Sequence, residues 1–296
     1  MNILKNFIWA IIHWFLSRFF PRVLVSYIFR RIFHRSMNWK NPCDLNEKIN
    51  WLKFNSDTTE WTRLADKYAV REYVKEKGFE DILVPLYGKW DKAEDIDWDS
   101  LPEQFVMKTN HGSGDALICF DKRKIDRAKV TKEFSTLLTK KFGYKLGEPH
   151  YNNIKPCIIA EQLLDSSKQQ IQSSSPIDYK IWCFNGKAEY IWACYDRTKD
   201  SVMVGTYDLD WNFHPEYSVS THHYILADKP IPRPLSLDRM IEAACKLSEG
   251  YPLVRIDFYE IDGKPYFGEM TFTSNGGYND FYTQEFLDLL GSKCKL

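Results

Sequence analysis

The stretch LVRIDFYEIDGKPYFGEMTF, residues 253–272, constrains the fold most strongly. Apolar and polar side chains alternate on both sides of its Asp262–Gly263 dipeptide, as in two strands joined by a tight turn. Residues 178–196 form a second such unit around Asn185–Gly186. Further apolar strands are expected at 105–110, 116–122 and 157–164, and helical patterns at 46–78, 124–143 and 236–250. The sequence therefore predicts an α+β fold with antiparallel strand pairs, without a regular β-α-β alternation.

The register of the 253–272 hairpin decides where its charged side chains point. A two-residue turn at Asp262–Gly263 would place Glu269 on the face opposite Asp257. A three-residue loop at 261–263 would pair Arg255 with Glu269 and bring both to the face of Asp257. We favour the three-residue loop, because it buries the apolar side chains and lets the charged ones converge.

Two carboxylates and an arginine on one sheet face suit a divalent cation that carries phosphate oxygens. Asp257 and Glu269 would supply hard oxygen ligands, and Arg255 a fixed positive charge. A simple Arg–Glu surface pair across two strands is the alternative, and it is the commoner arrangement for a hairpin that stands alone.

Lys108 ends the apolar strand FVMKTN, and the sequence HGSGD, residues 111–115, follows within three residues. Glycines in such a connection let backbone N–H groups approach phosphates, while the lysine adds a point charge. The spacing is not that of a Walker A loop, and a glycine connection between strands is more often a plain turn. Glu161 lies near the end of the strand CIIAEQLL, where a polar residue is also ordinary.

Taken in order, these residues resemble the ATP-grasp superfamily, which includes D-alanine–D-alanine ligase and biotin carboxylase. The motifs FVMKTNHGSGD, DYKIWCFNGK and RIDFYEIDGKPYFGEMTFTSNGG are most similar to its TupA-like branch, which is linked to teichuronopeptide and bacterial surface-polysaccharide synthesis. The resemblance runs from about Asn46 to Asp280. It implies an ATP-grasp fold, in which two α+β subdomains clasp ATP.

The resemblance implies a role for each motif residue, with ATP and Mg²⁺ as cofactors. Lys67 and Lys108 would hold ATP phosphates, and Arg255 would steady the transferring phosphoryl group and the acyl oxyanion. The loop of His111, Gly112, Ser113 and Gly114 would cover the phosphates. Glu161 and Asp178 would bind the adenosine end, with Lys180 as a further nucleotide or substrate contact. Asp257 and Glu269 would hold Mg²⁺.

Two features depart from the superfamily pattern. Members commonly have Asn two residues beyond the metal glutamate, where this chain has Thr271; either Asn275 compensates as a metal ligand or a second metal is held differently. The N-terminal Rossmann-like domain of larger members is missing or much reduced. We expect a membrane-surface segment at 1–43, a reduced helical and linker region at 44–100, a lid subdomain at 101–160 and a core subdomain with the metal site at 161–296.

Residues 1–43 contain seven basic residues and no acidic one. Polar and proline positions, Arg18 and Pro21 among them, interrupt their apolar stretches, so a transmembrane span of about 20 apolar residues is not expected; nor is a cleaved signal peptide. We expect an amphipathic segment of two short helices broken at Pro21, lying on an anionic membrane surface with Trp and Phe inward. The alternative is a pair of core helices that cover the catalytic body.

The seven cysteines are scattered, without a CxxC pair or His/Cys metal spacing. This usage predicts buried thiols in a reducing cytosol. Together with the basic segment, it predicts a cytoplasmic protein that is peripheral at the inner face of the cell membrane.

The predicted activity is an ATP-dependent ligation of a carboxylate to an amine in bacterial surface-polysaccharide biosynthesis. A substrate carboxylate would attack the γ-phosphate to form an acyl phosphate, and an amine would then displace phosphate. The carboxylate could be a uronic acid of a lipid-linked saccharide and the amine an amino acid, with no nucleic-acid partner. Three alternatives stay open: an ATP-grasp sugar kinase, a non-catalytic membrane scaffold, and a glycosyltransferase that uses Asp95–Asp97, Asp97–Asp99 or Asp208–Asp210.

Overall fold

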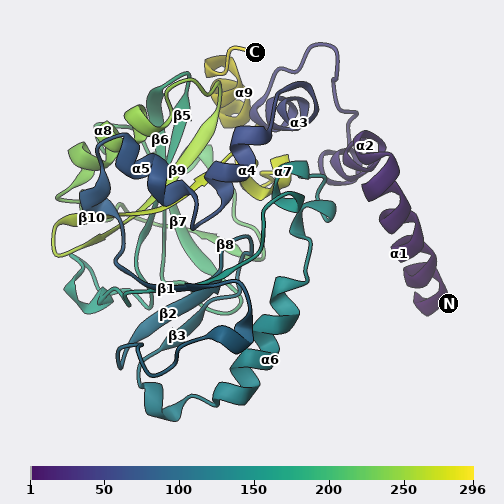
Figure 1. Ribbon diagram of the computed structural model, residues 1–296. Helices are drawn as coiled ribbons and strands as arrows, with labels where there is room; N and C mark the ends of the chain where they lie inside the picture. Colours follow the sequence, from purple (N-terminus) through teal and green to yellow (C-terminus); the bar gives the residue numbers. More distant parts are fainter. Residues whose placement is uncertain (1) are drawn as a thin grey trace.

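A computed structural model describes residues 2–296, with side chains from Phe7 onward. Two β-sheets form the body, and helices surround them (Figure 1). All strand pairs are antiparallel except β7 with β8. The predicted α+β class and the helical N-terminal segment are confirmed.

The larger sheet has the strand order β10-β9-β5-β6-β7-β8. Both predicted hairpins lie in it, with two-residue turns at Asn185–Gly186 and Asp262–Gly263. All four turn residues have positive φ, 51° and 80° in the first turn and 55° and 69° in the second, as a type I′ turn requires. The strands are β5 (Asp178–Phe184), β6 (Lys187–Tyr195), β7 (Val202–Tyr207), β8 (Tyr224–Leu226), β9 (Val254–Ile261) and β10 (Lys264–Thr271).

Helix α8 (Leu237–Leu247) covers one face of the larger sheet. Its apolar residues Leu237, Met240 and Ala244 recur at helical spacing, and all three are fully buried. They belong to the same core cluster as Ile181 of β5 and Ile256 of β9. Helix α9 (Gln284–Lys293) adds to this cluster and packs beside α3 (Leu45–Asn55).

The smaller sheet has the order β1-β4-β2-β3 and lies below the larger one in Figure 1. Helix α6 (Arg127–Leu138) packs on it through Val130 and Phe134, and Asp126 caps the helix by accepting a bond from Lys129 N at 3.0 Å. The strands are β1 (Leu86–Trp90), β2 (Phe105–Thr109), β3 (Leu117–Cys119) and β4 (Ile158–Glu161). This sheet therefore takes its edge strand β1 from the region before residue 100, and the domain boundaries stay a prediction.

The helical run predicted up to Gly78 is divided after Ala65. Helix α4 (Thr59–Ala65) stops there, and α5 (Val70–Glu76) follows. The reason is local: the Asp66 carboxylate accepts bonds from Tyr68 N at 2.8 Å and Ala69 N at 3.1 Å, which competes with helical bonding. The remaining short helices are α7 (Pro149–Asn152), η1 (Glu80–Ile82), η2 (Ala93–Asp95), η3 (Lys122–Lys124), η4 (Phe142–Tyr144), η5 (Ser166–Lys168), η6 (Pro215–Tyr217) and η7 (Ser274–Gly277).

The N-terminal segment forms two helices that differ in burial. Helix α1 (Asn2–Phe19) extends away from the body in Figure 1, and α2 (Pro21–Phe33) begins at Pro21 as predicted. Leu24, Val25 and Phe29 of α2 are fully buried. More than half of the exposed large apolar side chains in the described chain lie instead between residues 7 and 32. No helix within residues 2–296 has the length and apolar character to cross a membrane.

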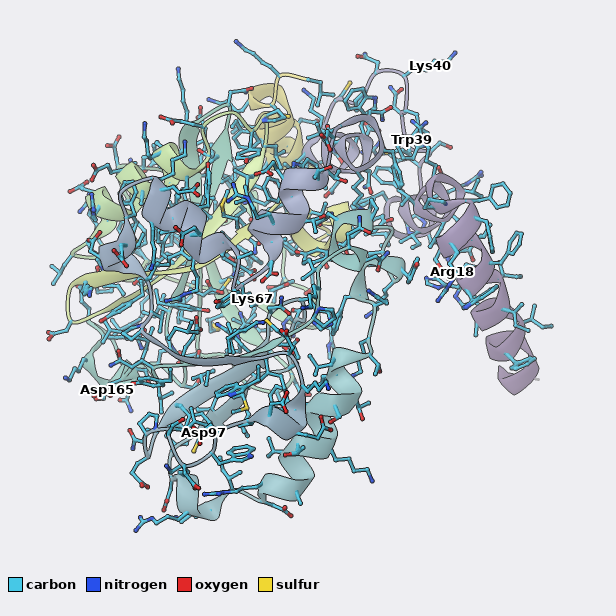
Figure 2. All side chains as sticks on the ribbon, viewed as in Figure 1. Arg18, Trp39, Lys40, Lys67, Asp97 and Asp165 are labelled. Atoms are coloured by element: carbon cyan, nitrogen blue, oxygen red, sulfur yellow. The ribbon has the colours of Figure 1, made fainter. Side chains whose placement is uncertain are left out.

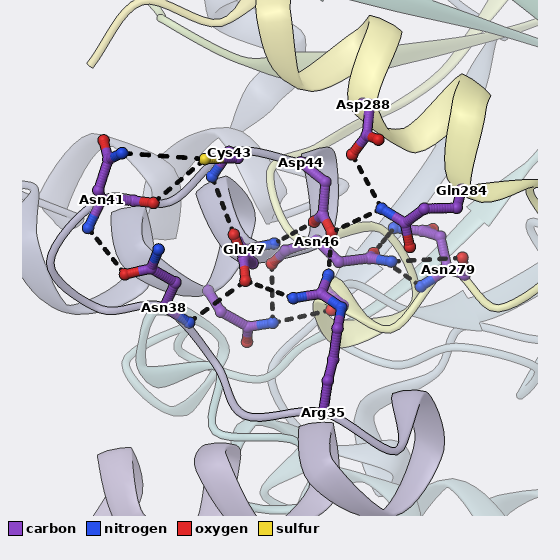
Figure 3. A network of polar contacts seen from close by, with 12 residues as sticks. Arg35, Asn38, Asn41, Cys43, Asp44, Asn46, Glu47, Asn279, Gln284 and Asp288 are labelled. Carbon is purple, nitrogen blue, oxygen red and sulfur yellow. Dashed lines mark hydrogen bonds and ion pairs between the residues drawn. The ribbon is translucent and has the colours of Figure 1, made fainter.

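A polar network joins the end of α2 to the body (Figure 3). Arg35 forms ion pairs with Asp44 and with Glu47, the latter at 2.5 Å. Asn46 Oδ1 accepts bonds from both the backbone and the side-chain N–H of Asn279 at 2.8 Å. The N-terminal helices are therefore fixed to residues that follow β10.

All seven cysteines are free thiols. Five are buried, in agreement with the predicted reduced state, whereas Cys43 is exposed and Cys245 is half-buried. Burial raises the pKa of Cys157 to about 12, so this thiol stays protonated and unreactive.

Candidate active site

The β9–β10 hairpin brings Asp257 and Glu269 together, by a route other than the one predicted. The turn has two residues, so the three-residue loop is wrong. A β-bulge between Phe267 and Glu269 then shifts the register by one residue, and Glu269 lies opposite Asp257. The skipped residue is Gly268, where a Cβ would lie 3.0 Å from the Asp257 carbonyl oxygen. Glycine thus permits the close backbone approach that a bulge needs here.

Arg255 and Asp257 form a buried bidentate ion pair on β9. Arg255 Nε donates to Asp257 Oδ1 at 2.7 Å, and Nη2 donates to Oδ2 at 2.8 Å. Nη2 is also 3.6 Å from Glu269 Oε1. Burial opposes the charge of Asp257, but Arg255 and Lys180 outweigh it and lower the pKa of this carboxyl. The pair is therefore ionised and fixed in orientation at neutral pH.

Lys180 reaches the same carboxylate from the neighbouring strand β5. Its Nζ lies 2.6 Å from Asp257 Oδ2 and also pairs with Asp178 Oδ2. Burial raises the pKa of Asp178; Lys180 opposes this, and the nearby Asp257 carboxylate adds to it. Asp178 Oδ1 is buried and has no hydrogen-bond partner in the described part of the chain. One oxygen of the Asp178 carboxylate is therefore unused within the described chain.

Lys108 and Glu161 form the corresponding pair on the smaller sheet. Lys108 Nζ is 2.6 Å from Glu161 Oε2, and Arg71 Nη1 of α5 is 3.2 Å from Oε1. Glu161 is thus bound by two cations, while the Lys108 side chain keeps about a quarter of its surface exposed. The adenosine role of Glu161 stays a prediction.

Lys67 links the two sheets. It lies in the break between α4 and α5, and Figure 2 shows it between the upper and lower parts of the body. Its Nζ donates to the Gly112 carbonyl oxygen at 2.7 Å and is 3.8 Å from Glu269 Oε2. Its backbone N–H donates to Asn110 O at 3.0 Å. The glycine loop and the carboxylate face therefore border one space.

The glycine loop is closed by its own side chains. Thr109 Oγ1 donates to Asp115 Oδ2, and Thr109 N donates to the same oxygen at 3.2 Å. Gly112 lies inside this closure, and a Cβ there would be 2.4 Å from Asp115 Oδ2. A larger residue at this position would therefore displace the Asp115 and Thr109 side chains and open the closure.

The predicted loop residues fall into buried and exposed sets. His111 is buried, its Nε2 lies 3.2 Å from Lys140 O, and burial lowers its pKa, so it is neutral. Ser113 and Gly114 are exposed, and Gly114 has a φ of 72° with open space around it. The tip of the loop is therefore free to approach a ligand, whereas His111 anchors its base.

Asn275 is not brought to the carboxylate face. It is exposed, and its Nδ2 donates to Tyr278 O at 2.6 Å. Its neighbour Ser274 lies there instead, because its hydroxyl accepts a bond from Arg255 Nη1 at 2.6 Å and donates to Asn279 Oδ1 at 2.9 Å. The nearest signal in the sequence was the polar run TSNGG after β10, which did not single out Ser274.

Sequence reasoning also missed two other residues of the site. Thr271 Oγ1 donates to Glu269 Oε1 at 3.1 Å and accepts from Arg255 Nη2 at 3.3 Å. Arg71 pairs with Glu161. In the sequence, Thr271 stands out only because superfamily members commonly have Asn at its position. No local pattern marks Arg71, because its partner Glu161 lies 90 residues further along the chain.

The DxD candidates lie outside this arrangement. Asp97 and Asp208 accept bonds from backbone N–H groups of the turns that follow them, and Asp99 pairs with Arg127 at 3.0 Å. Asp97 is well separated from Lys67 in Figure 2. These carboxylates therefore have local partners that account for them.

A family model described as TupA-like ATPgrasp matches residues 47–295, and no curated protein matches the sequence. Among solved structures the chain is similar to D-alanine–D-alanine ligase from Bacillus anthracis complexed with ATP (15% identity, TM-score 0.43), covering 73% of this chain and 57% of that one. It is also similar to the ATP-grasp ligase PsnB complexed with minimal precursor, Mg and ADP (11% identity, TM-score 0.42), covering 95% and 72%.

This chain spans less than two thirds of the length of the D-alanine–D-alanine ligases that it matches. The family match, by contrast, covers most of the present sequence and confirms the predicted resemblance. The chain belongs to the TupA-like ATPgrasp family.

Proposed function

We propose that this protein is an ATP-dependent ligase that joins a carboxylate to an amine through an acyl phosphate. The observation that carries the proposal is the position of Lys67, which contacts both Gly112 of the small sheet's loop and Glu269 of the large sheet. To bind a triphosphate with its cation, a protein needs a lysine and backbone N–H groups for the phosphates and carboxylates for the cation, all around one space. These three kinds of group meet at Lys67.

The phosphates would bind between the two sheets. Lys67 and Lys108 would supply positive charge, and the backbone N–H groups of the exposed residues Ser113 and Gly114 would approach the phosphate oxygens. Asp178 Oδ1, buried without a partner among the described residues, suits a ribose hydroxyl, which would donate to it. Glu161 would release one of its two cations to meet the adenosine end. Lys180 holds Asp178 in place for this contact.

The residues at the carboxylate face fit a magnesium ion. Asp257 Oδ1 accepts one bond in the described chain, from Arg255, so a lone pair is left. Glu269 is 39% exposed and lies directly opposite Asp257. Mg²⁺ prefers oxygen ligands and usually takes one or two carboxylates, completing its shell with water and phosphate oxygens. Asp257 and Glu269 would hold the ion, which would neutralise charge on the transferring phosphoryl group; Asn275 would take no part.

Arg255 would stabilise the charge that develops during transfer. Its guanidinium is held by Asp257, Ser274 and Thr271, so no reorganisation is required when a substrate oxygen becomes negative. Fixed donors of this kind act more strongly in a buried site than in water. The first step, attack of a carboxylate on the γ-phosphate, needs no general base. In the second step, an amine that arrives uncharged needs none either.

A saccharide carboxylate and an amino acid are the proposed substrates. Membership of the TupA-like family and its link to surface polysaccharides support this choice. The incoming carboxylate would be a uronic acid of a lipid-linked saccharide. Such a substrate would lie at a membrane, where α1 would also be placed.

Attachment of α1 to an anionic membrane is the second part of the proposal. Trp14, Phe15 and Phe19 of α1 are about half exposed, with Phe7 at 63%. An exposed helix with apolar side chains on most of its surface needs an apolar environment. Residues 1–43 carry no acidic side chain to repel lipid phosphates. The protein would therefore be peripheral at the cytoplasmic face of the cell membrane.

The activity is tested with purified protein, Mg²⁺-ATP, mixed amino acids and uronic-acid saccharides, following ADP, AMP and product mass. ADP with a product heavier by one amino-acid residue supports the ligase. A gain of one phosphate would make the protein a sugar kinase, and sugar transfer without ATP consumption a glycosyltransferase.

Two matched variants separate the candidate sites. Asp257→Asn removes a carboxylate of the proposed cation site and should abolish ATP-dependent product formation. Asp99→Asn changes an exposed carboxylate of a DxD pair and should leave it unchanged. The reverse result would favour the glycosyltransferase.

A further inference from the structure

The arginines of this protein fall into two groups. Every arginine from Arg35 onward lies within 4.0 Å of a carboxylate, namely Arg35, Arg63, Arg71, Arg123, Arg127, Arg197, Arg233, Arg239 and Arg255. In residues 7–296, no carboxylate pairs with Arg18, Arg22, Arg30 or Arg31. Protein anions thus neutralise the guanidinium groups of the body and none of those on α1 and α2.

Two of these four arginines pack against aromatic rings of the protein. The Arg18 guanidinium lies 4.3 Å from the ring centre of Tyr144, and that of Arg22 lies 4.7 Å from Trp39. Both stack on rings outside their own helix. Arg30 and Arg31 are exposed and lack such a long-range partner in the described chain, so their charges face outward.

These two side chains line a pocket on one face of α2. The pocket measures about 430 Å³ and is formed by Tyr27, Arg30, Arg31 and His34, which are spaced along one helix face. Arg31 Nη1 donates to Tyr27 Oη at 3.2 Å and is oriented by it. His34 ends the helix with a φ of 55°, its N–H donating to Arg30 O at 3.1 Å. Three nitrogen-bearing side chains therefore border one small space.

Trp9 of α1 packs against Tyr27 of this pocket, and α2 carries further exposed apolar side chains. The ring centre of Trp9 on α1 lies 4.7 Å from that of Tyr27, and Val23 and Ile32 of α2 are exposed. A ligand that fits here would combine an anionic head with an apolar body. Basic residues at a helix C-terminus can also serve the helix dipole alone, but that role concerns helix stability and gives no reason for exposed apolar neighbours.

We propose that the α2 pocket binds the phosphate group of an anionic phospholipid in the bilayer. The inference rests on the proposed attachment of α1 to a membrane and adds a defined headgroup site to it. Two guanidinium groups can each give a forked pair of hydrogen bonds to phosphate oxygens, while Trp9 and its neighbours lie among the acyl chains. If diffuse charge attraction alone caused membrane binding, replacing any basic residue of the segment would weaken binding by the same amount. If the pocket binds a phosphate group, replacing Arg30 or Arg31 would weaken it more than replacing the others.

The test is co-sedimentation of the full-length protein with vesicles of phosphatidylcholine alone or with added phosphatidylglycerol. Loss of one diffuse charge at an anionic surface weakens partitioning by about fivefold at most. Lys40→Gln, an exposed lysine on the loop after α2 (Figure 2), is the control for that effect. Arg30→Gln and Arg31→Gln should each weaken binding to anionic vesicles by about tenfold or more.

A charge-preserving variant distinguishes the pocket from diffuse attraction. Arg30→Lys/Arg31→Lys keeps both charges and removes both forks, and it should still lose several-fold in binding. If the pocket binds phosphate, inorganic phosphate should inhibit binding to anionic vesicles more strongly than chloride at equal ionic strength. Equal losses for Arg30→Gln and Lys40→Gln, with no effect of the lysine double variant, would overturn the pocket and leave membrane attachment standing. No binding of the wild type to either vesicle would overturn both.

Discussion

At the scale of single residues, Lys108 tests the nucleotide site most directly. Lys108→Ala removes the charge that would meet a phosphate and leaves Glu161 with Arg71. A charge-assisted hydrogen bond contributes about 1.5–3 kcal/mol, so we expect the Kd for ATP to rise by roughly tenfold or more and turnover nearly to vanish. Calorimetric titration with ATP and the rate of ADP release measure the two effects.

Lys124→Ala is the matched control for this variant. Lys124 lies in η3, directly after strand β3 of the same sheet, and is 84% exposed. Within the described residues it pairs only with Asp121, at 3.9 Å. Such a surface pair contributes little, and ATP binding should not change. Unchanged turnover in Lys108→Ala would remove that lysine from the mechanism.

The residues of the site were predictable where the sequence marks them by pattern. Lys108 and Asp257 were found because apolar strands surround them, and Gly112 because glycine is conspicuous between two strands. Arg71 and Ser274 were missed, since their importance comes from partners far away in the sequence, Glu161 and Arg255. Only folding brings those pairs together.

At the scale of elements, Asp257 and Glu269 of the β9–β10 hairpin lie on one face as predicted, but the turn and the strand register that bring them there differ from the prediction. Asp-Gly favours a two-residue turn, and the structure has it. We rejected that turn because strict alternation would have sent Glu269 to the other face. The bulge at Gly268 removes that conflict. A glycine just before Glu269 was the available signal for it.

The bulge leads to a prediction about Gly268→Ala. The added Cβ would lie 3.0 Å from the Asp257 carbonyl oxygen, so β10 must move and Glu269 with it. We expect the apparent KM for Mg²⁺ to rise several-fold, with a smaller change in stability. Gly250→Ala is the control, because its φ of 87° also makes alanine costly while the space around it is open. Equal effects of both variants on the Mg²⁺ dependence would rule out a special role for the bulge.

Lys53 ties α3 to the segment after β10 and makes a pH-dependent contribution to stability. It is fully buried, donating to Asn50 Oδ1 at 2.9 Å, to Leu146 O at 3.1 Å and to Gly276 O. Burial lowers its pKa from 10.5 to about 8, against the opposing charge of Glu148. Between these two pH values the unfolded chain binds more protons than the folded one, so stability rises with pH.

Lys53→Met should abolish that rise. The free energy of unfolding of the wild type, relative to the variant, should increase by up to about 3 kcal/mol from pH 8 to pH 10.5, and stay level below pH 8, where lysine is protonated in both states. Urea unfolding across this range measures it. Tyrosines titrate in both proteins and cancel in the difference. A difference that does not change with pH would contradict the lowered pKa.

At the scale of the whole molecule, the two helices of the N-terminal segment differ in how they pack. Helix α2 belongs to the core: Val25 and Phe29 pack in one cluster with Met37 and Tyr278. Helix α1 contributes no residue to the buried clusters of the described chain. A basic, aromatic sequence alone could not separate them, because both helices combine basic and aromatic side chains and it is their packing partners that distinguish them.

Two truncations should therefore behave differently. Deleting residues 1–19 removes α1 alone, and it should release the protein from membranes in cell fractionation while ATP binding stays unchanged. The melting temperature should fall only slightly, because the deletion removes the contacts of Arg18 with Tyr144 and of His13 with Lys145 but no residue of the buried clusters. Deleting residues 1–35 also removes the buried side chains of α2 and the pairs of Arg35 with Asp44 and Glu47, and should destabilise the fold. Loss of ATP binding in the shorter truncation would mean that α1 is core structure. Added salt should release the full-length protein only partly, because apolar burial is not screened.

The ion pairs of the candidate site also bear on how it would bind anions, because its lysines already have carboxylate partners. Lys108 pairs with Glu161, Lys180 with Asp257, and Lys67 lies 3.8 Å from Glu269. In the proposed site, ATP would therefore not bind to unpaired cations. Its phosphates would replace carboxylates that already pair with these lysines, and the released carboxylates would become available to a divalent cation and to adenosine. Other polyanions bring neither a magnesium ion nor a nucleoside for the freed carboxylates, so they would gain little from binding there.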